Sequence, residues 1–163
     1  RADIFSYMDA DLAVALDNIA DLITPIVDDE SDVVVGSRLL AGSKIKRSLG
    51  REMISRTYNF ISRLILRYQV KDLQCGFKAV RAETFRALRP CLRDDYWFFD
   101  TELIVLAPRF GYRIKEIPVD WQESRFEKRS STVKIIRDSL TFLNNLKNFR
   151  RRLKYIRKPG DNA

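Results

Sequence analysis

The sequence predicts a mixed α/β fold. Short apolar runs bounded by turn-forming residues are typical of strands, and segments with apolar residues at helical spacing separate them. The length of 163 residues is that of about one domain. A composition of 45% hydrophobic and 32% charged residues suits a soluble globular core. We therefore expect one α/β unit.

The first half of the sequence predicts two buried strands, each followed by a helix. Residues 4–8 form a largely apolar run that ends at Asp9, and residues 32–36 contain three consecutive valines. Apolar residues recur at helical spacing over 12–27 and again over 48–68. The stripe of the second helix is predicted to consist of Met53, Ile54, Tyr58, Ile61, Leu64 and Ile65, with arginines on the opposite face.

The second half predicts alternating elements and then a basic end. In order these are a strand over 75–80, a helix over 82–88, a helix over 100–110, a strand over 113–122 and a basic amphipathic segment over 132–156. Pro118 favours an edge position for its strand, because proline has no N–H to donate. Only about three strands are evident before the basic end. We therefore expect the amino-terminal half of a larger domain to be absent from this chain.

The composition excludes several kinds of active site. The sequence has no histidine, which removes Ser-His-Asp and Cys-His systems and histidine metal sites. A metal ion would be held by oxygen ligands, which favours Mg²⁺ or Mn²⁺ over zinc. Cys75 and Cys91 lack a C-x-x-C spacing and are interpreted as buried thiols of a reducing compartment. No run approaches the ~20 apolar residues that span a bilayer, and no signal peptide is evident.

The net charge of +8 is distributed in blocks. Residues 1–35 carry one basic and nine acidic side chains, a net charge of −8, whereas residues 36–71 carry nine basic and one acidic, a net charge of +8. Residues 123–158 carry twelve basic and three acidic side chains, a net charge of +9. An acidic region beside a basic one suits a metal-bound anionic substrate that meets a second anion.

Two acidic residues follow the first predicted strand. Ligands of open α/β sheets bind beyond the carboxyl ends of strands, so Asp9 and Asp11 are placed to hold a divalent cation and a diphosphate. The alternative is an ordinary turn or helix cap, since D-x-D is a weak pattern in an aspartate-rich chain.

Basic and small residues follow the second predicted strand. An oxyanion such as phosphate could bind here, at the start of a helix. The basic residues are Arg38 and, after it, Lys44, Lys46, Arg47 and Arg51. A solvated basic face is the alternative.

Two further motifs combine acids with other groups. In the DLQCGFK segment, Asp72 is placed to orient a sugar hydroxyl or accept a proton, and Gly76 gives the backbone room; a turn aspartate is the alternative. In the WFFDTE segment the aromatic residues 97–99 are interpreted as core, with Asp100 and Glu102 in the first turn of a helix.

The basic segment at the end has three interpretations. Its apolar residues recur at helical spacing among lysines and arginines, which is typical of a membrane-surface helix or a nucleic-acid arm. A helix packed on the domain or on a partner chain is the third. The acidic first block and the lack of a nucleic-acid-binding motif argue against nucleic acid.

Taken in order, six stretches resemble one family: YMDADL, DVVVGSR, REMISRTYN, DLQCGFKAVR, WFFDTEL and GYRIKEIPVDW. Together they cover most of residues 4–122 and are similar to a family 2 glycosyltransferase of the GT-A fold, in particular to dolichyl- or polyprenyl-phosphate glucosyltransferases and their mannosyl relatives. The D-x-Q-C-G-F-K and F-D-x-E-L patterns favour the glucosyl branch. Residues 1–128 then correspond to the carboxyl-terminal part of the catalytic domain, and residues 129–163 to a basic juxtamembrane helix and tail.

The resemblance implies roles for particular residues. Asp9 and Asp11 would bind Mg²⁺ or Mn²⁺ and, with Gly76, the donor, UDP-glucose or GDP-mannose. Arg38, Arg51 and Ser55 would bind the polyprenyl or dolichyl phosphate, and Asp72 would be the catalytic acid residue beside the sugar. The reaction would invert the anomeric centre of the sugar. It would take place at the cytoplasmic face of a membrane with an anionic surface, to which this chain would bind peripherally.

Two departures from the family pattern stand out. Position 13 is alanine where mannosyl relatives often have a polar side chain, and residues 130–134 replace the usual G-S-K. The alternatives to an enzyme are a nucleic-acid-binding module and a piece that serves only membrane docking or homo-oligomerisation.

Overall fold

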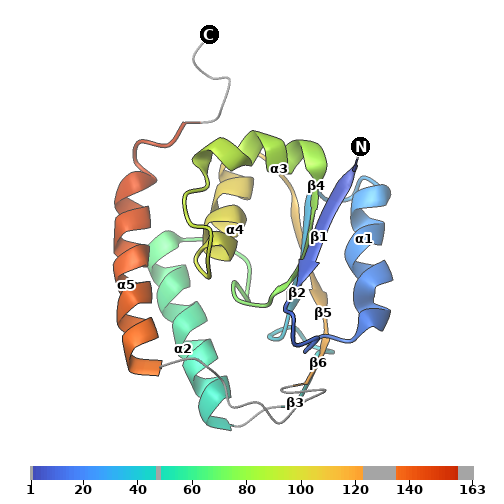
Figure 1. Ribbon diagram of the computed structural model, residues 1–163, viewed down its shortest axis with the longest axis horizontal. Coiled ribbons are helices and arrows are strands. Elements are labelled where there is room, and N and C mark those ends of the chain that lie inside the picture. The colour runs from blue at the N-terminus through green and yellow to red at the C-terminus, as the bar shows by residue number, and fades with distance from the viewer. Residues whose placement is uncertain (1, 47–48, 123–134, 158–163) are drawn as a thin grey trace.

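Two sheets and their surrounding helices make up the fold (Figure 1). The computed structural model describes residues 2–46, 49–122 and 135–157, without the side chains of Leu49, Arg51 and 135–140. The strands and helices, in chain order, are β1 (Ile4–Met8), α1 (Ile19–Val27), β2 (Val33–Ser37), β3 (Lys44–Lys46), α2 (Leu49–Leu66), β4 (Phe77–Arg81), α3 (Ala82–Leu88), α4 (Phe99–Arg109), β5 (Ile114–Pro118), β6 (Asp120–Gln122) and α5 (Ile135–Arg152).

The larger sheet has the strand order β1-β4-β2-β5. β4 is antiparallel to both β1 and β2, and β2 is parallel to β5. β1 and β2 therefore run in the same direction, so their carboxyl ends and the start of β4 meet at one edge of the sheet. The two-stranded sheet pairs β3 with β6 in parallel.

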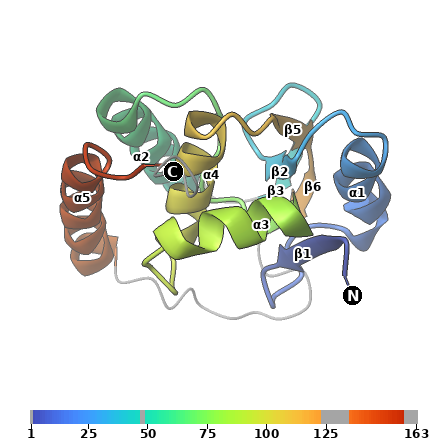
Figure 2. The same cartoon turned by 90° about the horizontal axis from the view of Figure 1, so that it is seen from above.

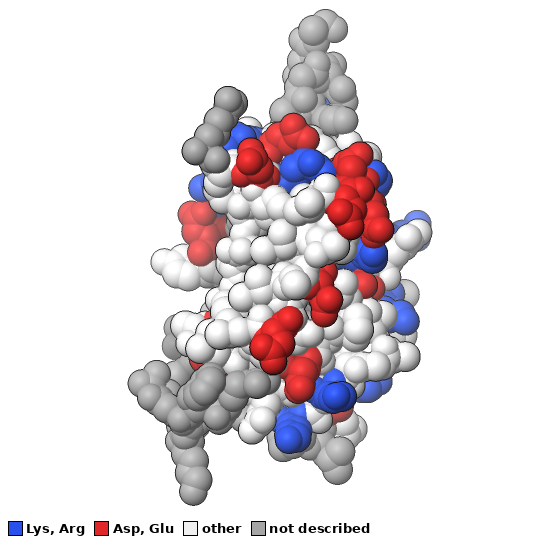
Figure 3. All heavy atoms as spheres, turned by 90° about the vertical axis from the view of Figure 1, so that its right-hand side faces the viewer, with Lys and Arg blue, Asp and Glu red and all other residues white. Residues whose placement is uncertain are grey.

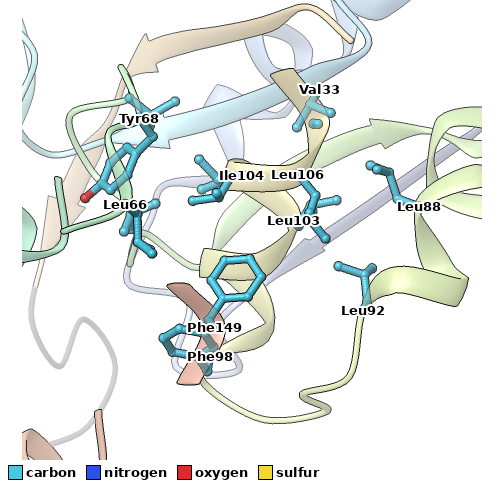
Figure 4. Packing of buried hydrophobic residues seen from close by; sticks show 14 of the residues in the cluster. Val33, Leu66, Tyr68, Leu88, Leu92, Phe98, Leu103, Ile104, Leu106 and Phe149 are labelled. Atoms are coloured by element: carbon cyan, nitrogen blue, oxygen red, sulfur yellow. The ribbon is translucent and has the colours of Figure 1, made fainter. Parts of the chain in front are cut away.

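The larger sheet lies between two helical layers. Figures 1 and 2 show α1 on one face, with α3, α4, α2 and α5 on the other side. Val34 packs into the cluster under α1, whereas Val33 and Val35 point into the larger cluster around α4, part of which Figure 4 shows. All five residues of β2 are buried, as expected of a strand covered on both faces. The expected α/β class is confirmed.

Most predicted elements are confirmed, among them the strand over 32–36, the helix over 82–88 and the helix over 100–110. β5 lies at an edge of its sheet, as Pro118 suggests. The predicted strand over 113–122 is two strands, however, because Val119 separates β5 from β6.

Two predictions near the start are wrong. The strand at 4–8 forms but is not buried: Phe5 and Ser6 are exposed, because β1 is an end strand of the sheet in the part of the chain that the structure describes, where less of the protein covers its faces. The helix over 12–27 begins only after residue 15, with a 3₁₀ turn at 16–18 before α1. Residues 13–15 instead run along β6, where Gln122 donates to the Ala13 carbonyl (2.8 Å) and Val14 bridges Trp121.

α2 turns only part of its predicted apolar stripe outward. Tyr58, Ile61 and Ile65 are half-buried, with Tyr58 packed against Phe142 and Ile65 against the larger core cluster. Met53, Ile54 and Leu64 are exposed, whereas the buried positions of the helix include Ser55 and Asn59. The polar residues point inward because they anchor the loop that precedes β4, as described below.

α5 packs on the domain, in agreement with one of the three interpretations of the basic end. Leu146, Phe149 and Leu153 are buried in the larger cluster, and the Glu102–Arg152 ion pair (2.5 Å) joins α4 to α5. Residues 129–134 lie outside the described residues. Within the described part of the chain, no helix has the length and apolar character needed to cross a membrane.

Candidate active site

The predicted site residues meet at the sheet edge where β1 and β2 end and β4 begins. Asp9 follows β1, Arg38 follows β2, and Asp72 and Gly76 precede β4. The antiparallel pairing of β4 with both strands brings these segments together, although they are far apart in the sequence.

Asp9 lies directly against Gly76. Its backbone N–H donates to the Gly76 carbonyl (2.8 Å), and a Cβ atom at Gly76 would lie 2.1 Å from Asp9 Oδ1. Any side chain at position 76 would therefore displace the Asp9 carboxylate. The absence of a side chain at Gly76 is required for this position of Asp9, while the role of Gly76 in donor binding stays a prediction.

Within the D-x-D motif, the charge of Asp11 acts on Asp9. Burial raises the pKa of Asp9, and the charge of Asp11 raises it further. Asp11 is exposed and its Oδ1 accepts a hydrogen bond from the Ala13 N–H (3.1 Å), which fixes the loop.

These carboxylates fit a divalent cation. Both are oxygen ligands of the kind that Mg²⁺ and Mn²⁺ prefer, and a cation would relieve the charge repulsion at Asp9. Among the described residues no cluster of three or more metal-ligating side chains occurs. If an ion binds here, Asp9 and Asp11 are the described residues available to hold it.

Arg38 and Asp72 form a bidentate ion pair inside the protein. Arg38 Nε donates to Asp72 Oδ2 (2.7 Å) and Nη2 to Oδ1 (2.9 Å), while the Arg38 backbone N–H also donates to Oδ2 (3.0 Å). The Asp72 side chain is fully buried and that of Arg38 is 10% exposed. The guanidinium also lies 5.7 Å from the ring centre of Trp121.

The pair fixes the charge of both groups. Burial alone would raise the pKa of Asp72, but the charge and hydrogen bonds of Arg38 outweigh it and lower the pKa to about 2. For Arg38, burial would lower the pKa, yet Asp72 raises it above its ordinary value. Asp72 is therefore an ionised carboxylate at neutral pH, better suited to holding Arg38 than to donating a proton.

α2 and β5 supply the support for Asp72. Asn59 Oδ1 accepts from the Leu73 N–H (2.9 Å), its Nδ2 donates to the Ser55 carbonyl (3.0 Å), and Glu116 accepts from the Asp72 N–H (3.3 Å). Ser55 is buried, and its Oγ has no hydrogen-bond partner among the described residues. Arg51 belongs to the first turns of the same helix, but its side chain lies outside the described part.

Three further polar residues were not predicted as part of the site. Lys78 is fully buried and pairs with Asp100 (2.9 Å), whose other oxygen accepts from the Tyr7 hydroxyl (2.5 Å). Lys78 also donates to the Cys75 carbonyl. The spacing along the strands could have indicated two of them. Tyr7 lies two residues before Asp9 and Lys78 two residues after Gly76, so each shares a strand face with a site residue.

Several neighbouring predictions have mixed outcomes. Phe98 belongs to the core, but Trp97 is exposed, because it precedes α4 in a loop. Cys75 is a buried free thiol whose pKa burial raises to about 12, whereas the free thiol Cys91 is only half-buried. The exposed residues Lys44 and Lys46 belong to the unpredicted strand β3.

Comparison with known proteins agrees with the resemblance. The glycosyl transferase family 2 pattern matches residues 1–89, more than half of the chain. Glycosyltransferase AglD of Haloferax volcanii is 40% identical over 140 residues, covering 86% of this chain and 22% of that protein. Dolichyl-phosphate beta-glucosyltransferase of Dictyostelium discoideum is 31% identical over 126 residues, covering 74% and 38%.

A mannosyl relative also matches. Undecaprenyl-phosphate mannosyltransferase of Micrococcus luteus is 28% identical over 123 residues, covering 74% of this chain and 50% of that protein. The chain thus spans between about a fifth and a half of the length of these relatives. Its α/β fold and its ordered motifs define a sugar-transferase domain. It belongs to glycosyltransferase family 2.

Proposed function

We propose that this domain takes part in transferring a hexose, with glucose favoured, from a nucleotide-diphosphate sugar to a polyprenyl or dolichyl phosphate. The observation that carries the proposal is the meeting of the Asp9–Asp11 carboxylates and the buried Arg38–Asp72 pair at one sheet edge. The names of the relatives, which include dolichyl-phosphate and undecaprenyl-phosphate glycosyltransferases, support the acceptor class.

Asp9 and Asp11 are proposed to hold the donor end of the site. A bound Mg²⁺ or Mn²⁺ would neutralise the diphosphate of UDP-glucose or GDP-mannose as it leaves. The contact of Asp9 with Gly76 supports this role, because it fixes one carboxylate at the strand end.

The acceptor phosphate is proposed to meet Arg38, Ser55 and Arg51. Asp72 engages Nε and Nη2 of Arg38, and Nη1 takes no part in these bonds. The buried Ser55 hydroxyl, without a partner among the described residues, suits a phosphate oxygen. Asp72 would act as a positioning residue that keeps the guanidinium in place.

The proposed chemistry needs little proton transfer. A phosphate oxygen of the acceptor attacks the anomeric carbon, and the bond to the nucleoside diphosphate breaks with its electron pair, so the centre is inverted. The attacking group is already an anion, so positioning and charge neutralisation supply the catalysis. A carboxylate with a pKa of about 2, such as Asp72, agrees with this chemistry, which needs no general base.

We place this activity at the cytoplasmic face of a membrane, where the chain would be peripheral and meet anionic lipid. The free thiols of Cys75 and Cys91 fit a reducing compartment. The basic helix α5, with exposed residues such as Lys147, Arg150 and Arg151, supports attraction to anionic lipid.

Calorimetry tests the donor half of the proposal. The chain, and a longer protein that contains it, are titrated with UDP-glucose or GDP-mannose with and without Mn²⁺. We expect Mn²⁺-dependent binding of one donor that Asp9→Asn and Asp11→Asn abolish and that Asp17→Asn, an exposed acid outside the site, retains. Binding that survives both site substitutions would refute the assignment, and duplex DNA binding in place of donor binding would favour the nucleic-acid alternative.

A further inference from the structure

Three polar side chains form a cluster beside the candidate site. Tyr7 and Lys78 are opposite each other in the pairing of β1 with β4, and the first turn of α4 brings Asp100 against both. Lys78 Nζ lies 2.9 Å from Asp100 Oδ2, and the Tyr7 hydroxyl donates to Oδ1 (2.5 Å). The Lys78 side chain is fully buried, whereas that of Asp100 is 19% exposed. We call these three residues the polar cluster.

The polar cluster shares a sheet face with Asp9 and Gly76. The hydrogen bond from the Asp9 N–H to the Gly76 carbonyl continues the pairing of β1 with β4. Because side chains alternate along paired strands, Tyr7 and Asp9 project to the same side, and Lys78 projects to the side on which a Cβ at Gly76 would meet Asp9. Two residues along a strand span about 7 Å. The polar cluster therefore lies one side-chain position further along the same face of the sheet than Asp9.

The stability of the fold does not by itself explain a fully buried lysine. Moving two charges out of water is costly, and apolar side chains in place of a buried ion pair are often neutral or stabilising. Many acidic side chains of this protein lie at the surface instead, as Figure 3 shows for the side of the molecule that carries α1. The partly exposed Asp100 and its buried partner thus indicate a role in the site.

The Asp100 carboxylate keeps the capacity to accept further hydrogen bonds. An ionised carboxylate has about four acceptor positions. Among the described residues, Tyr7 and Lys78 take one position on each oxygen. A carboxylate that is already held in place suits a hydroxyl donor, because little conformational freedom is lost when the bond forms. The hydroxyls of a hexose are donors of this kind.

We propose that Asp100 is a further donor-binding residue, which accepts a hydrogen bond from a hydroxyl of the hexose, and that Lys78 is the positioning residue that holds its carboxylate. The inference rests on the proposed function, since it takes the diphosphate to lie at Asp9 and Asp11. Asp100 would recognise the sugar and not the nucleotide. It would not act as a base, because the acceptor phosphate is already an anion.

Calorimetry with two ligands that differ in the sugar tests the inference. A longer protein that contains this chain is titrated, in the presence of Mn²⁺, with the donor that it binds, UDP-glucose or GDP-mannose, and with UDP or GDP alone. We expect Asp100→Asn to weaken binding of the donor about tenfold, because a hydrogen bond to a charged group is lost. Binding of the nucleoside diphosphate should weaken less than about twofold, because Asp100 does not touch it.

Two further variants and a control accompany Asp100→Asn. Lys78→Met removes the group that holds Asp100. Tyr7→Phe removes one hydroxyl and keeps the ring, so it remains informative where a buried charge change prevents folding. Both should weaken donor binding more than nucleoside diphosphate binding, Tyr7→Phe by about threefold. Asp95→Asn, at an exposed position of the loop before α4, should bind both ligands as the unchanged protein does.

The outcomes separate this inference from the proposed function. Equal losses of donor and nucleoside diphosphate binding in the three variants would assign the polar cluster to the fold alone, and undiminished donor binding in Asp100→Asn would remove Asp100 from the site. Either result overturns the inference and leaves the donor site of Asp9 and Asp11 standing. Absence of metal-dependent binding of either ligand by the unchanged protein would refute that donor site, and the inference with it.

Discussion

At the scale of single residues, Gly76 controls the position of Asp9. A Cβ at Gly76 would lie 2.1 Å from Asp9 Oδ1, so Gly76→Ala forces the carboxylate away. We expect loss of Mn²⁺-dependent donor binding with a change in stability of less than about 1 kcal/mol, because only the end of the exposed Asp9 side chain has to move. Calorimetry and urea unfolding measure the two effects. Gly50→Ala is the control, since a Cβ there meets nothing within 4 Å and alanine favours a helix by up to about 1 kcal/mol.

The Arg38–Asp72 pair gives a second residue-scale prediction. The pKa of Asp72 is lowered from 3.8 to about 2 in the folded protein. A lowered carboxylate pKa stabilises the fold above pH 4, and this contribution, on the order of 2 kcal/mol, is lost as pH falls from about 4 to about 2. Asp72→Asn removes it but leaves Arg38 buried without its partner, at a cost of about 3–5 kcal/mol near neutral pH.

Urea unfolding at several pH values checks this prediction. The difference in stability between the unchanged protein and Asp72→Asn should narrow as pH falls from 5 toward 2. A difference that stays constant over that range would contradict the lowered pKa.

At the scale of elements, α2 depends on its inward polar face. Asn59→Ala leaves the buried Leu73 N–H without its acceptor, and we expect destabilisation by about 1–3 kcal/mol. Thr57→Ala, an exposed position of the same helix, should change stability by less than about 0.5 kcal/mol. Thermal unfolding of both variants distinguishes them, and equal losses would contradict the anchoring role of Asn59.

The same helix shows how far sequence patterns reach. The periodicity of apolar residues predicted both ends of α2 within about two residues, because helical spacing indicates that apolar side chains share a face. It could not report that Met53, Ile54 and Leu64 point outward while Asn59 is buried, since that depends on the loop that Asn59 holds. The prediction of a helix at residues 13–15 was wrong for a related reason, because their partner strand, β6, lies more than 100 residues further along the chain.

The site was predictable in its members and not in its pairings. Asp9, Arg38, Asp72 and Gly76 follow or precede predicted strands, where ligands of α/β folds bind. No pattern in a single sequence indicates that Arg38 pairs with Asp72, 34 positions away. The same holds for Lys78, which is neutralised by Asp100 at the start of another helix.

At the scale of the whole molecule, one buried ion pair joins α5 to the rest. Arg152 Nη2 donates to Glu102 Oε1 (2.5 Å), and its guanidinium lies 4.9 Å from the Phe149 ring centre. Arg152→Met leaves Glu102 buried with only backbone N–H partners, so we expect the free energy of unfolding to fall by about 3 kcal/mol. Hydrogen exchange should quicken in α5 while β2 and β4 stay protected.

The control for this prediction is Arg150→Met at an exposed position of the same helix, which should leave exchange unchanged. Faster exchange in β2 and β4 as well would show that α5 unfolds only together with the sheet.

The strand order of the larger sheet also has a consequence for protein synthesis. Among the described residues β1 pairs with β4, and β2 pairs with β4 and β5, so the strand pairings that bring Asp9 and Arg38 together form only after a much later segment has left the ribosome. Pairings between segments so distant are slow to form. Asp9 and Arg38 are therefore translated long before the contacts that hold them exist, and a nascent chain that stops before β4 carries the D-x-D motif without the glycine that positions it.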